Sequence, residues 1–167
     1  MTELMLRPIQ PHDNNVLASI IRDSIDELSL PHDGTAYSDP TTDDLFSLFN
    51  TPGSFYYTLL VDGIVMGGCG IFPTIGLPAN CAELVRFFLR PEARGKKWGH
   101  LLMNICIDKA LELGYTSLYL ESFPDMQSAM HLYKRYGFET LQRPLGQTGH
   151  HSCNVWMLKN MKESKVV

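Results

Sequence analysis

The sequence lacks the cysteine and histidine spacings that hold metals or disulfides. Its four cysteines stand singly in apolar surroundings with no Cys-x-x-Cys pair, and its six histidines form no His-Glu-x-x-His pattern. Isolated cysteines of this kind are typical of free thiols in a reducing compartment. We therefore expect neither a disulfide framework nor a metal site.

Long apolar segments are also missing. The longest apolar tract, residues 55–72, is interrupted by Asp62-Gly63, which indicates a hairpin and not a membrane span. The first thirteen residues, MTELMLRPIQPHD, lack the apolar stretch of a secretory signal. We therefore expect a cytoplasmic protein with no membrane partner.

Positive charge is scarce overall but locally concentrated. The chain has 14 Lys and Arg against 18 Asp and Glu, a net charge of -4, which argues against a nucleic-acid partner. Five basic residues nevertheless fall between positions 86 and 97, namely Arg86, Arg90, Arg94, Lys96 and Lys97. Such a cluster in an acidic protein favours a small anionic ligand, and a solvated run of surface charge is the alternative.

The basic cluster lies where a strand-like segment meets a helix. Residues 84–90 have strand character, Pro91 ends them, and the turn RGKKWG at residues 94–99 leads into an amphipathic helix. The first N–H groups of a helix have no internal partners, and the macrodipole places roughly half a positive charge there. Glycine lets backbone amides approach an anion closely. The segment therefore predicts a nucleotide-phosphate site.

These residues resemble the signature of the GNAT superfamily of acetyl-CoA-dependent N-acetyltransferases. The family's pattern E-L-x-R-x-x-V-x-P-E-x-R-G and its phosphate motif Arg/Gln-x-x-Gly-x-Gly/Ala are matched by Glu83, Leu84, Arg86, Leu89, Pro91, Glu92, Arg94, Gly95 and Gly99. Lys97 replaces the middle glycine of the phosphate motif. A second match, A-x-x-L-Y-x-x-Y-G-F at residues 129–138, has the family's spacing, with Met126 in place of its usual Asn.

Local patterns predict strands and helices that alternate along the chain. Strands are expected at 3–9, 55–61, 64–72, 84–89, 115–121, 138–142 and 154–159, and helices after Pro11, after Thr41, at 97–113 and at 125–136. The order is β-α-α-β-β-β-α-β-α-β-β, which the resemblance also implies. We expect an α/β (α+β) fold, a mixed and mostly antiparallel central sheet flanked by helices, in one domain over residues 1–167.

The resemblance implies an acyltransferase that moves an acetyl group from acetyl-CoA to a primary amine by direct attack in a ternary complex. The cofactor pyrophosphate would lie on Arg94, Gly95, Lys96, Lys97, Trp98, Gly99 and His100. The pantetheine arm would run along Phe87, Phe88 and Leu89, and a backbone N–H near Leu89 would polarise the thioester carbonyl.

The same resemblance assigns catalytic roles. Tyr133 occupies the position of the family's general acid, which protonates the departing thiolate, and a buried aromatic on its helix is the alternative. Glu83 matches the glutamate that many relatives use as general base, and Glu121 would end the neighbouring strand in the same cleft. His150 and His151 are a third candidate, since a neutral imidazole accepts protons at pH 7.

Two loops, residues 29–41 and 146–152, are expected to border the acceptor. The first carries His32, Asp33, Tyr37 and Asp39, and its two aspartates would attract a cationic amine. Neither loop is long or acidic enough to form a peptide channel. A small-molecule amine is therefore favoured over a protein N-terminus or lysine.

A non-catalytic acetyl-CoA-binding sensor or interaction module is the competing function. Lys97 and Met126 support it, because both depart from the family at cofactor-side positions. Tyr133 and Glu83 favour the enzyme, since a sensor needs neither. An edge for a homodimer is expected on the last strand, at Trp156, Met157 and Leu158.

Overall fold

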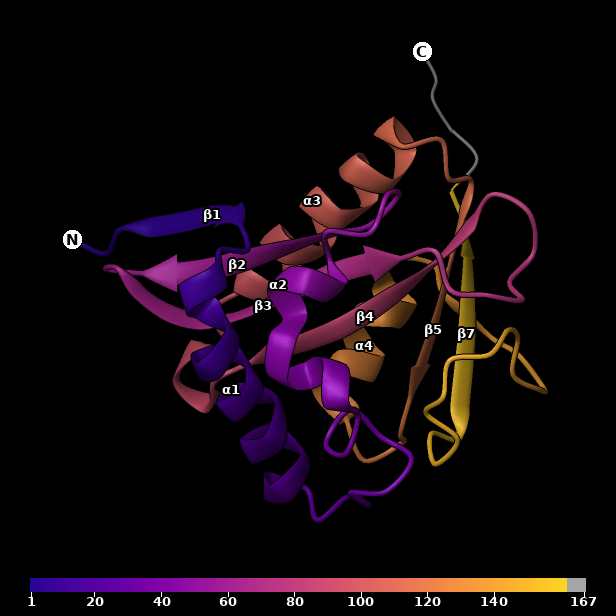
Figure 1. Ribbon diagram of the computed structural model, residues 1–167, viewed down its shortest axis with the longest axis horizontal. Coiled ribbons are helices and arrows are strands. Elements are labelled where there is room, and N and C mark those ends of the chain that lie inside the picture. The colour runs from indigo at the N-terminus through magenta and orange to yellow at the C-terminus, as the bar shows by residue number, and fades with distance from the viewer. Residues whose placement is uncertain (162–167) are drawn as a thin grey trace.

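The computed structural model describes residues 1–161, which form a seven-stranded sheet with helices on both faces (Figure 1). The strands are β1 (Leu4–Pro8), β2 (Phe55–Val61), β3 (Ile64–Phe72), β4 (Cys81–Leu89), β5 (Ser117–Ser122), β6 (Glu139–Thr140) and β7 (Val155–Asn160). The helices are α1 (Asn14–Glu27), α2 (Leu45–Leu48), α3 (Trp98–Glu112) and α4 (Gln127–Arg135), with 3₁₀ turns at Pro11–Asp13, Pro40–Asp44 and Pro91–Ala93. The predicted order of strands and α-helices is confirmed. No helix in this part of the chain is long and apolar enough to cross a membrane.

The sheet has the order β1-β2-β3-β4-β5-β7-β6, and β4 and β5 are its parallel pair. All the other neighbours are antiparallel, as predicted. The parallel pairing is short, running from Cys81↔Ser117 to Glu83↔Tyr119. Beyond Glu83 the two strands part, while β4 stays paired with β3 as far as Leu89 (Figure 1). The sheet therefore opens between β4 and β5 toward the end of β4.

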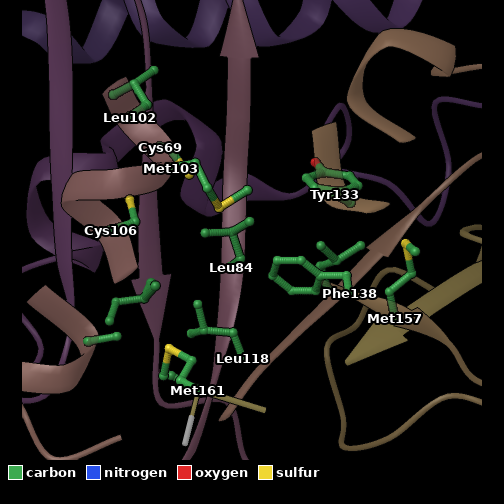
Figure 2. Close-up of a cluster of buried hydrophobic side chains, with 14 of the residues drawn as sticks. Cys69, Leu84, Leu102, Met103, Cys106, Leu118, Tyr133, Phe138, Met157 and Met161 are labelled. Atoms are coloured by element: carbon green, nitrogen blue, oxygen red, sulfur yellow. The ribbon is translucent and has the colours of Figure 1, made fainter. Parts of the chain in front are cut away.

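Apolar side chains fill both faces of the sheet. On one face α3 and α4 cover a cluster that includes Cys69, Leu84, Leu102, Met103, Cys106, Tyr133, Phe138 and Met157 (Figure 2). On the opposite face α1 and α2 cover Leu17, Ile21, Ile25, Leu45 and Tyr56. Each large side chain removed from water in this way contributes about 1.5–3 kcal/mol, and the two clusters fix the helices against the sheet.

The last strands differ most from the prediction. The expected strand at 138–142 shrinks to β6, because Phe138 turns into the core after the left-handed Gly137. The homodimer edge expected on β7 is wrong, since β7 lies between β5 and β6. Met157 and Leu158 pair with β6, and the Trp156 carbonyl accepts the Leu141 N–H at 2.7 Å. The backbone of this segment is therefore already paired.

A β-bulge interrupts β4 shortly after Glu83, where β4 and β5 have parted. The register of β3 against β4 shifts between Gly68 and Gly70, and Arg86 on β4 has a left-handed φ of +52°. On β3, Gly67 (φ +149°) approaches β4 so closely that an added Cβ would collide with the carbonyl oxygen of Phe88. The glycines of β3 thus allow β4 to bend away from β5.

Gly67→Ala is expected to destabilise the fold by roughly 3 kcal/mol or more, because the collision is with backbone that cannot move without disrupting the bulge. Gly63→Ala is the matched control. Gly63 also has a positive φ (+80°), but its Cβ would meet nothing within 4 Å, so about 1 kcal/mol should be lost. Unfolding in urea measures the free energy of unfolding of both variants. Equal losses of stability would show that the close approach of β3 to β4 does not require glycine at position 67.

Candidate active site

The turn before α3 has the backbone conformation that an anion site requires. Lys97 is the N-cap of α3 in a left-handed conformation (φ +66°, ψ +14°), and Gly95 is also left-handed with open space beside it. Lys97 therefore adopts a conformation that glycine takes without strain, at a cost of about 1–2 kcal/mol. The first N–H groups of α3 have no partner within the helix and suit a phosphate.

The Arg94 side chain is directed away from this turn. Its guanidinium donates to the Leu89 carbonyl at 3.0 and 2.9 Å and pairs with Glu27 at the end of α1 at 2.7 Å. Arg94 therefore ties β4 to α1. An anion at the turn is left to the backbone amides and to the exposed Lys96, whose ammonium lies 5.7 Å from the centre of the Trp98 ring.

The residues predicted along the cofactor lie on two faces of β4. Phe87 and Leu89 face α3, where a Cβ added to Gly99 would lie 3.6 and 4.0 Å from their side chains. Phe88 packs on the opposite face with the α1 layer. His100 is half buried in the first turn of α3, with its ring toward the end of α4. Phe87 and Leu89 thus border the turn, and Phe88 borders the α1 side.

Tyr133 is buried on α4 beside β4. Its ring lies 6.3 Å from that of Phe87 and 5.8 Å from that of Phe138. Burial raises the pKa of Tyr133 well above its usual value, so the phenol keeps its proton at neutral pH. Within residues 1–161 its hydroxyl makes no hydrogen bond, yet it is not sealed from solvent. Tyr133 thus presents a proton donor that is not already engaged.

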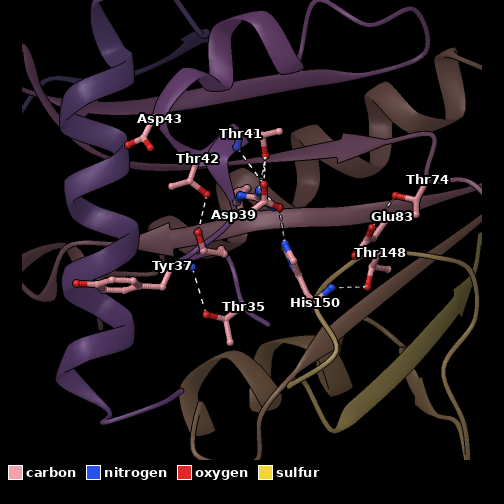
Figure 3. A network of polar contacts seen from close by, with 12 residues as sticks. Thr35, Tyr37, Asp39, Thr41, Thr42, Asp43, Thr74, Glu83, Thr148 and His150 are labelled. Atoms are coloured by element: carbon pink, nitrogen blue, oxygen red, sulfur yellow. Dashed lines mark hydrogen bonds and ion pairs between the residues drawn. The ribbon is translucent and has the colours of Figure 1, made fainter. Parts of the chain in front are cut away.

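Glu83 stands at the last paired position of β4 and β5, and it is only 5% exposed. The Thr74 hydroxyl donates to its Oε1 at 2.6 Å (Figure 3). Burial raises the pKa of Glu83 to about 7, and the nearby Glu121 carboxylate adds to the rise, whereas Thr74 and Arg86 oppose it. At neutral pH this carboxyl both holds and releases a proton, as a general base must.

Glu83 lines a cavity of about 70 Å³ on the α1 face of the sheet. Most of the wall is apolar and includes Ile25, Leu30, Val85, Phe88, Phe123 and Met126. Its ionisable members include Glu83, Arg86, His150 and Cys153. Because Phe87 faces α3 and Phe88 faces this cavity, β4 separates the turn before α3 from a cavity that contains a buried carboxyl.

A polar network joins the loop after α1 to the loop before β7 at this cavity (Figure 3). Asp39 Oδ2 accepts from Arg86 Nη2 at 3.1 Å and lies 2.8 Å from His150 Nε2. Asp39 Oδ1 accepts the N–H and the hydroxyl of Thr41, at 3.0 and 2.7 Å. His150 foremost, then Thr41 and Arg86, hold the pKa of Asp39 far below its usual range, although burial opposes them. Asp39 is therefore a permanent anion.

Glu121 has a different environment from Glu83. Its two carboxylate oxygens accept the hydroxyls of Tyr119 and Thr148, both at 2.6 Å. Tyr119 in turn accepts the N–H of Leu145 at 3.0 Å. Glu121 thus fastens the loop before β7 to β5 with both of its oxygens engaged.

Of the four histidine and tyrosine candidates for the acceptor site, His150 lines the cavity. His32 stacks on Tyr37 with ring centres 3.5 Å apart, and its Nε2 lies 2.6 Å from Asp26 Oδ1. His151 is exposed beside the loop after α1. The structure thus brings His150 to Glu83 and places His32, Tyr37 and His151 outside the cavity wall.

The cysteines in the structure are free thiols. Cys69, Cys81 and Cys106 are buried, and the half-buried Cys153 lines the cavity. Across residues 1–161, no group of three or more His, Cys, Asp or Glu side chains is placed to hold a metal ion.

Sequence reasoning missed several residues at the cavity. Arg86 entered as a motif position and as one of the five clustered basic residues, Asp39 as an aspartate of a loop expected to border the acceptor, and Thr74 not at all. An arginine inside the apolar run LVRFFL is a usable signal, because charged residues are rarely buried without a role. No local pattern identifies Thr74 or Cys153, whose places depend on how distant loops fold back.

A family model described as acetyltransferase (GNAT) family matches residues 22–138. The chain belongs to this family. It is 34% identical over 158 residues to the uncharacterized N-acetyltransferase YjgM of Escherichia coli, an alignment that covers 94% of this chain and 95% of that protein. The protein is accordingly an acyltransferase, and the family's acetyl donor is acetyl-CoA.

Solved structures share the fold. A GNAT-family acetyltransferase from Staphylococcus aureus superposes with a TM-score of 0.85 at 19% identity, over 96% of this chain and 100% of that one. The PaiA N-acetyltransferase from Thermoplasma acidophilum, in complex with coenzyme A, gives 0.72 at 19% identity, over 95% and 99%.

The acetyltransferase has a backbone that fits acetyl-CoA. The positive end of α3, the left-handed Lys97 and the space at Gly95 suit a pyrophosphate. Beyond Glu83, β4 has an edge that β5 does not cover, along which an extended pantetheine arm would pair as an added strand.

Glu83→Gln is expected to change stability little at pH 5 and to raise the free energy of unfolding at pH 8 by about 3 kcal/mol. The folded-state pKa of about 7 lies above the ordinary value of 4.5, so the folded wild type binds the extra proton and loses stability as pH rises through that interval. The amide can still accept the Thr74 hydrogen bond. Urea unfolding at the two pH values measures the difference, and an equal change at both would contradict the raised pKa.

Proposed function

We propose that this acetyltransferase moves an acetyl group from acetyl-CoA to the primary amine of a small molecule, by direct attack in a ternary complex. The observation that carries this proposal is the buried Glu83 carboxyl, with a pKa near 7, in a cavity where β4 and β5 part. A cavity of about 70 Å³ admits only the end of a small molecule. We further propose that residues 1–167 act as one domain in the cytoplasm.

The amine has to lose a proton before it can attack. Primary amines are mostly protonated at pH 7, because their pKa is about 10. The Glu83 carboxylate would take that proton, directly or through a water molecule. Glu121 is less suited to this role, since hydroxyls already occupy both of its oxygens.

Bound acetyl-CoA supplies the thioester carbonyl that the amine attacks. Backbone N–H groups near Leu89, at the open edge of β4, would donate to the carbonyl oxygen as charge develops there. Such donors cost no reorganisation, because the bulge and the pairing with β3 already hold them in place.

Tyr133 would give its proton to the departing sulfur. Burial keeps the phenol protonated in the resting enzyme. The same apolar surroundings disfavour a bare thiolate, which makes the sulfur more basic and proton transfer easier. Lys97 departs from the family in residue type, but its left-handed backbone is one that glycine adopts without strain, which weakens the case for a non-catalytic sensor.

Tyr133→Phe is expected to lower kcat by about 10²-fold or more while the Kd for coenzyme A changes little, because only the transition state uses the proton. Thiol release with a panel of primary amines measures turnover, and calorimetric titration measures Kd. Tyr115→Phe is the control, since its hydroxyl donates to the Gly53 carbonyl at 2.7 Å, away from the cavity.

Unchanged turnover in Tyr133→Phe would remove Tyr133 from the acid role. Absence of thiol release with every amine, from folded wild-type protein that binds coenzyme A, would overturn the proposed function itself.

A further inference from the structure

We infer that the acceptor carries a carboxylate in addition to its amine, and that Arg86 binds this carboxylate inside the cavity. The inference rests on the proposed function and names the class of molecule that the site takes, a small amino acid-like compound with an apolar remainder.

Arg86 is placed in the cavity by the bulge in β4. Its left-handed φ of +52° costs about 1–2 kcal/mol, and bulges redirect side chains in this way. The buried Tyr56 hydroxyl donates to the Arg86 carbonyl at 2.9 Å and holds the distorted backbone. The Arg86 side chain is only 5% exposed, and the residue lines the cavity. The strained backbone at Arg86 thus places a positive charge in a cavity whose wall is mostly apolar.

The guanidinium of Arg86 is incompletely satisfied. Its Nη2 donates to Asp39 Oδ2 at 3.1 Å and to Thr41 Oγ1 at 3.0 Å. Its Nε is, within residues 1–161, the one buried side-chain nitrogen or oxygen with no hydrogen-bond partner. Native proteins rarely leave a buried donor unpaired, because its lost hydration is not replaced. A ligand oxygen would complete the set, and a carboxylate matches the guanidinium in shape and charge.

The groups around the cavity offer a partner to each end of a zwitterion. Asp39 already faces both Arg86 and His150. Glu83 lies three residues before Arg86 on β4, about 10 Å away along an extended strand. An acceptor with its ammonium toward Glu83 and its carboxylate toward Arg86 pairs both of its charges and brings no net charge into a buried space. A simple amine would pair with Glu83 alone and would offer Arg86, whose Nε has no hydrogen-bond partner in the described part of the chain, no acceptor.

The remaining wall limits the rest of the molecule. The apolar residues around Phe88, Phe123 and Met126 leave about 70 Å³. Burying a polar or charged substituent there without partners would be costly. The wall therefore suits a small amino acid with an apolar side chain, of which the cavity takes one end.

The first test compares matched acceptors on the wild-type enzyme. Alanine, valine and leucine are each assayed for thiol release as the free acid, the primary amide and the decarboxylated amine. The amine pKa of each amino acid lies between that of its amide, which is lower, and that of its decarboxylated amine, which is higher. A preference for the acid over both compounds therefore does not follow from amine basicity. We expect kcat/KM to be at least tenfold higher for the acids, mainly through KM. Equal or better use of the amides and amines would overturn the inference while leaving acetyl transfer intact.

Binding gives a readout that does not depend on turnover. Calorimetric titration of the coenzyme A complex with the same compounds should detect the acids and not the amides. Binding of the acids without thiol release would support Arg86 recognition and overturn the proposed function. Absence of binding by the acids, or equal binding by the amides, would overturn the inference.

Substitution at Arg86 tests the residue itself. Arg86→Gln should raise KM at least tenfold more for the acids than for the amides. Because this change also deprives Asp39 of a partner, Arg86→Gln/Asp39→Asn, which removes both charges, is tested beside it for folding by thermal unfolding. A purely structural Arg86 would impair acids and amides equally, and that result would contradict the inference.

Discussion

β4 and β5 pair only from Cys81 to Glu83 before they part, and the rest of the site depends on that separation. The bulge at Arg86 turns β4 away from β5. Gly67 on β3 lets the two backbones stay close to each other there, because it has no Cβ to collide with the Phe88 carbonyl. The opening leaves an edge of β4 unpaired, and Glu83 lies where the opening begins. The two sides of the opening are the α3 face and the α1 face of the sheet. A single distortion of the backbone therefore prepares both the cofactor side and the acceptor side.

The two carboxyls of the cavity region differ because their partners differ. Asp39 accepts hydrogen bonds on both oxygens and faces Arg86, which hold its pKa far below the usual range and keep it ionised at neutral pH. Glu83 is more deeply buried and has one hydroxyl donor, Thr74, so burial dominates and its pKa rises to about 7. Asp39 can thus orient Arg86 and His150, while Glu83 remains able to exchange a proton.

Local patterns were sufficient to predict the order of elements and the turn between β4 and α3. The hairpin at Asp62-Gly63 fixed the bounds of β2 and β3, because turn type and strand alternation are both encoded within a few residues. The acceptor side was not predictable in this way. Arg86 and His150 lie 47 and 111 positions from Asp39, and no local pattern encodes their meeting. The dimer edge failed for a related reason, since the last strand in the sequence is not the last in the sheet.

We propose that coenzyme A binds at the turn before α3 and along the open edge of β4. Backbone amide NMR spectra recorded during titration with coenzyme A would locate the ligand, because each amide reports its own position. We expect large chemical-shift changes at residues 87–89 and 95–100, with β1 and the hairpin turn at Asp62-Gly63 unchanged. Chemical-shift changes confined to other parts of the sheet would contradict this binding site. So would the absence of any change in the folded protein at millimolar coenzyme A.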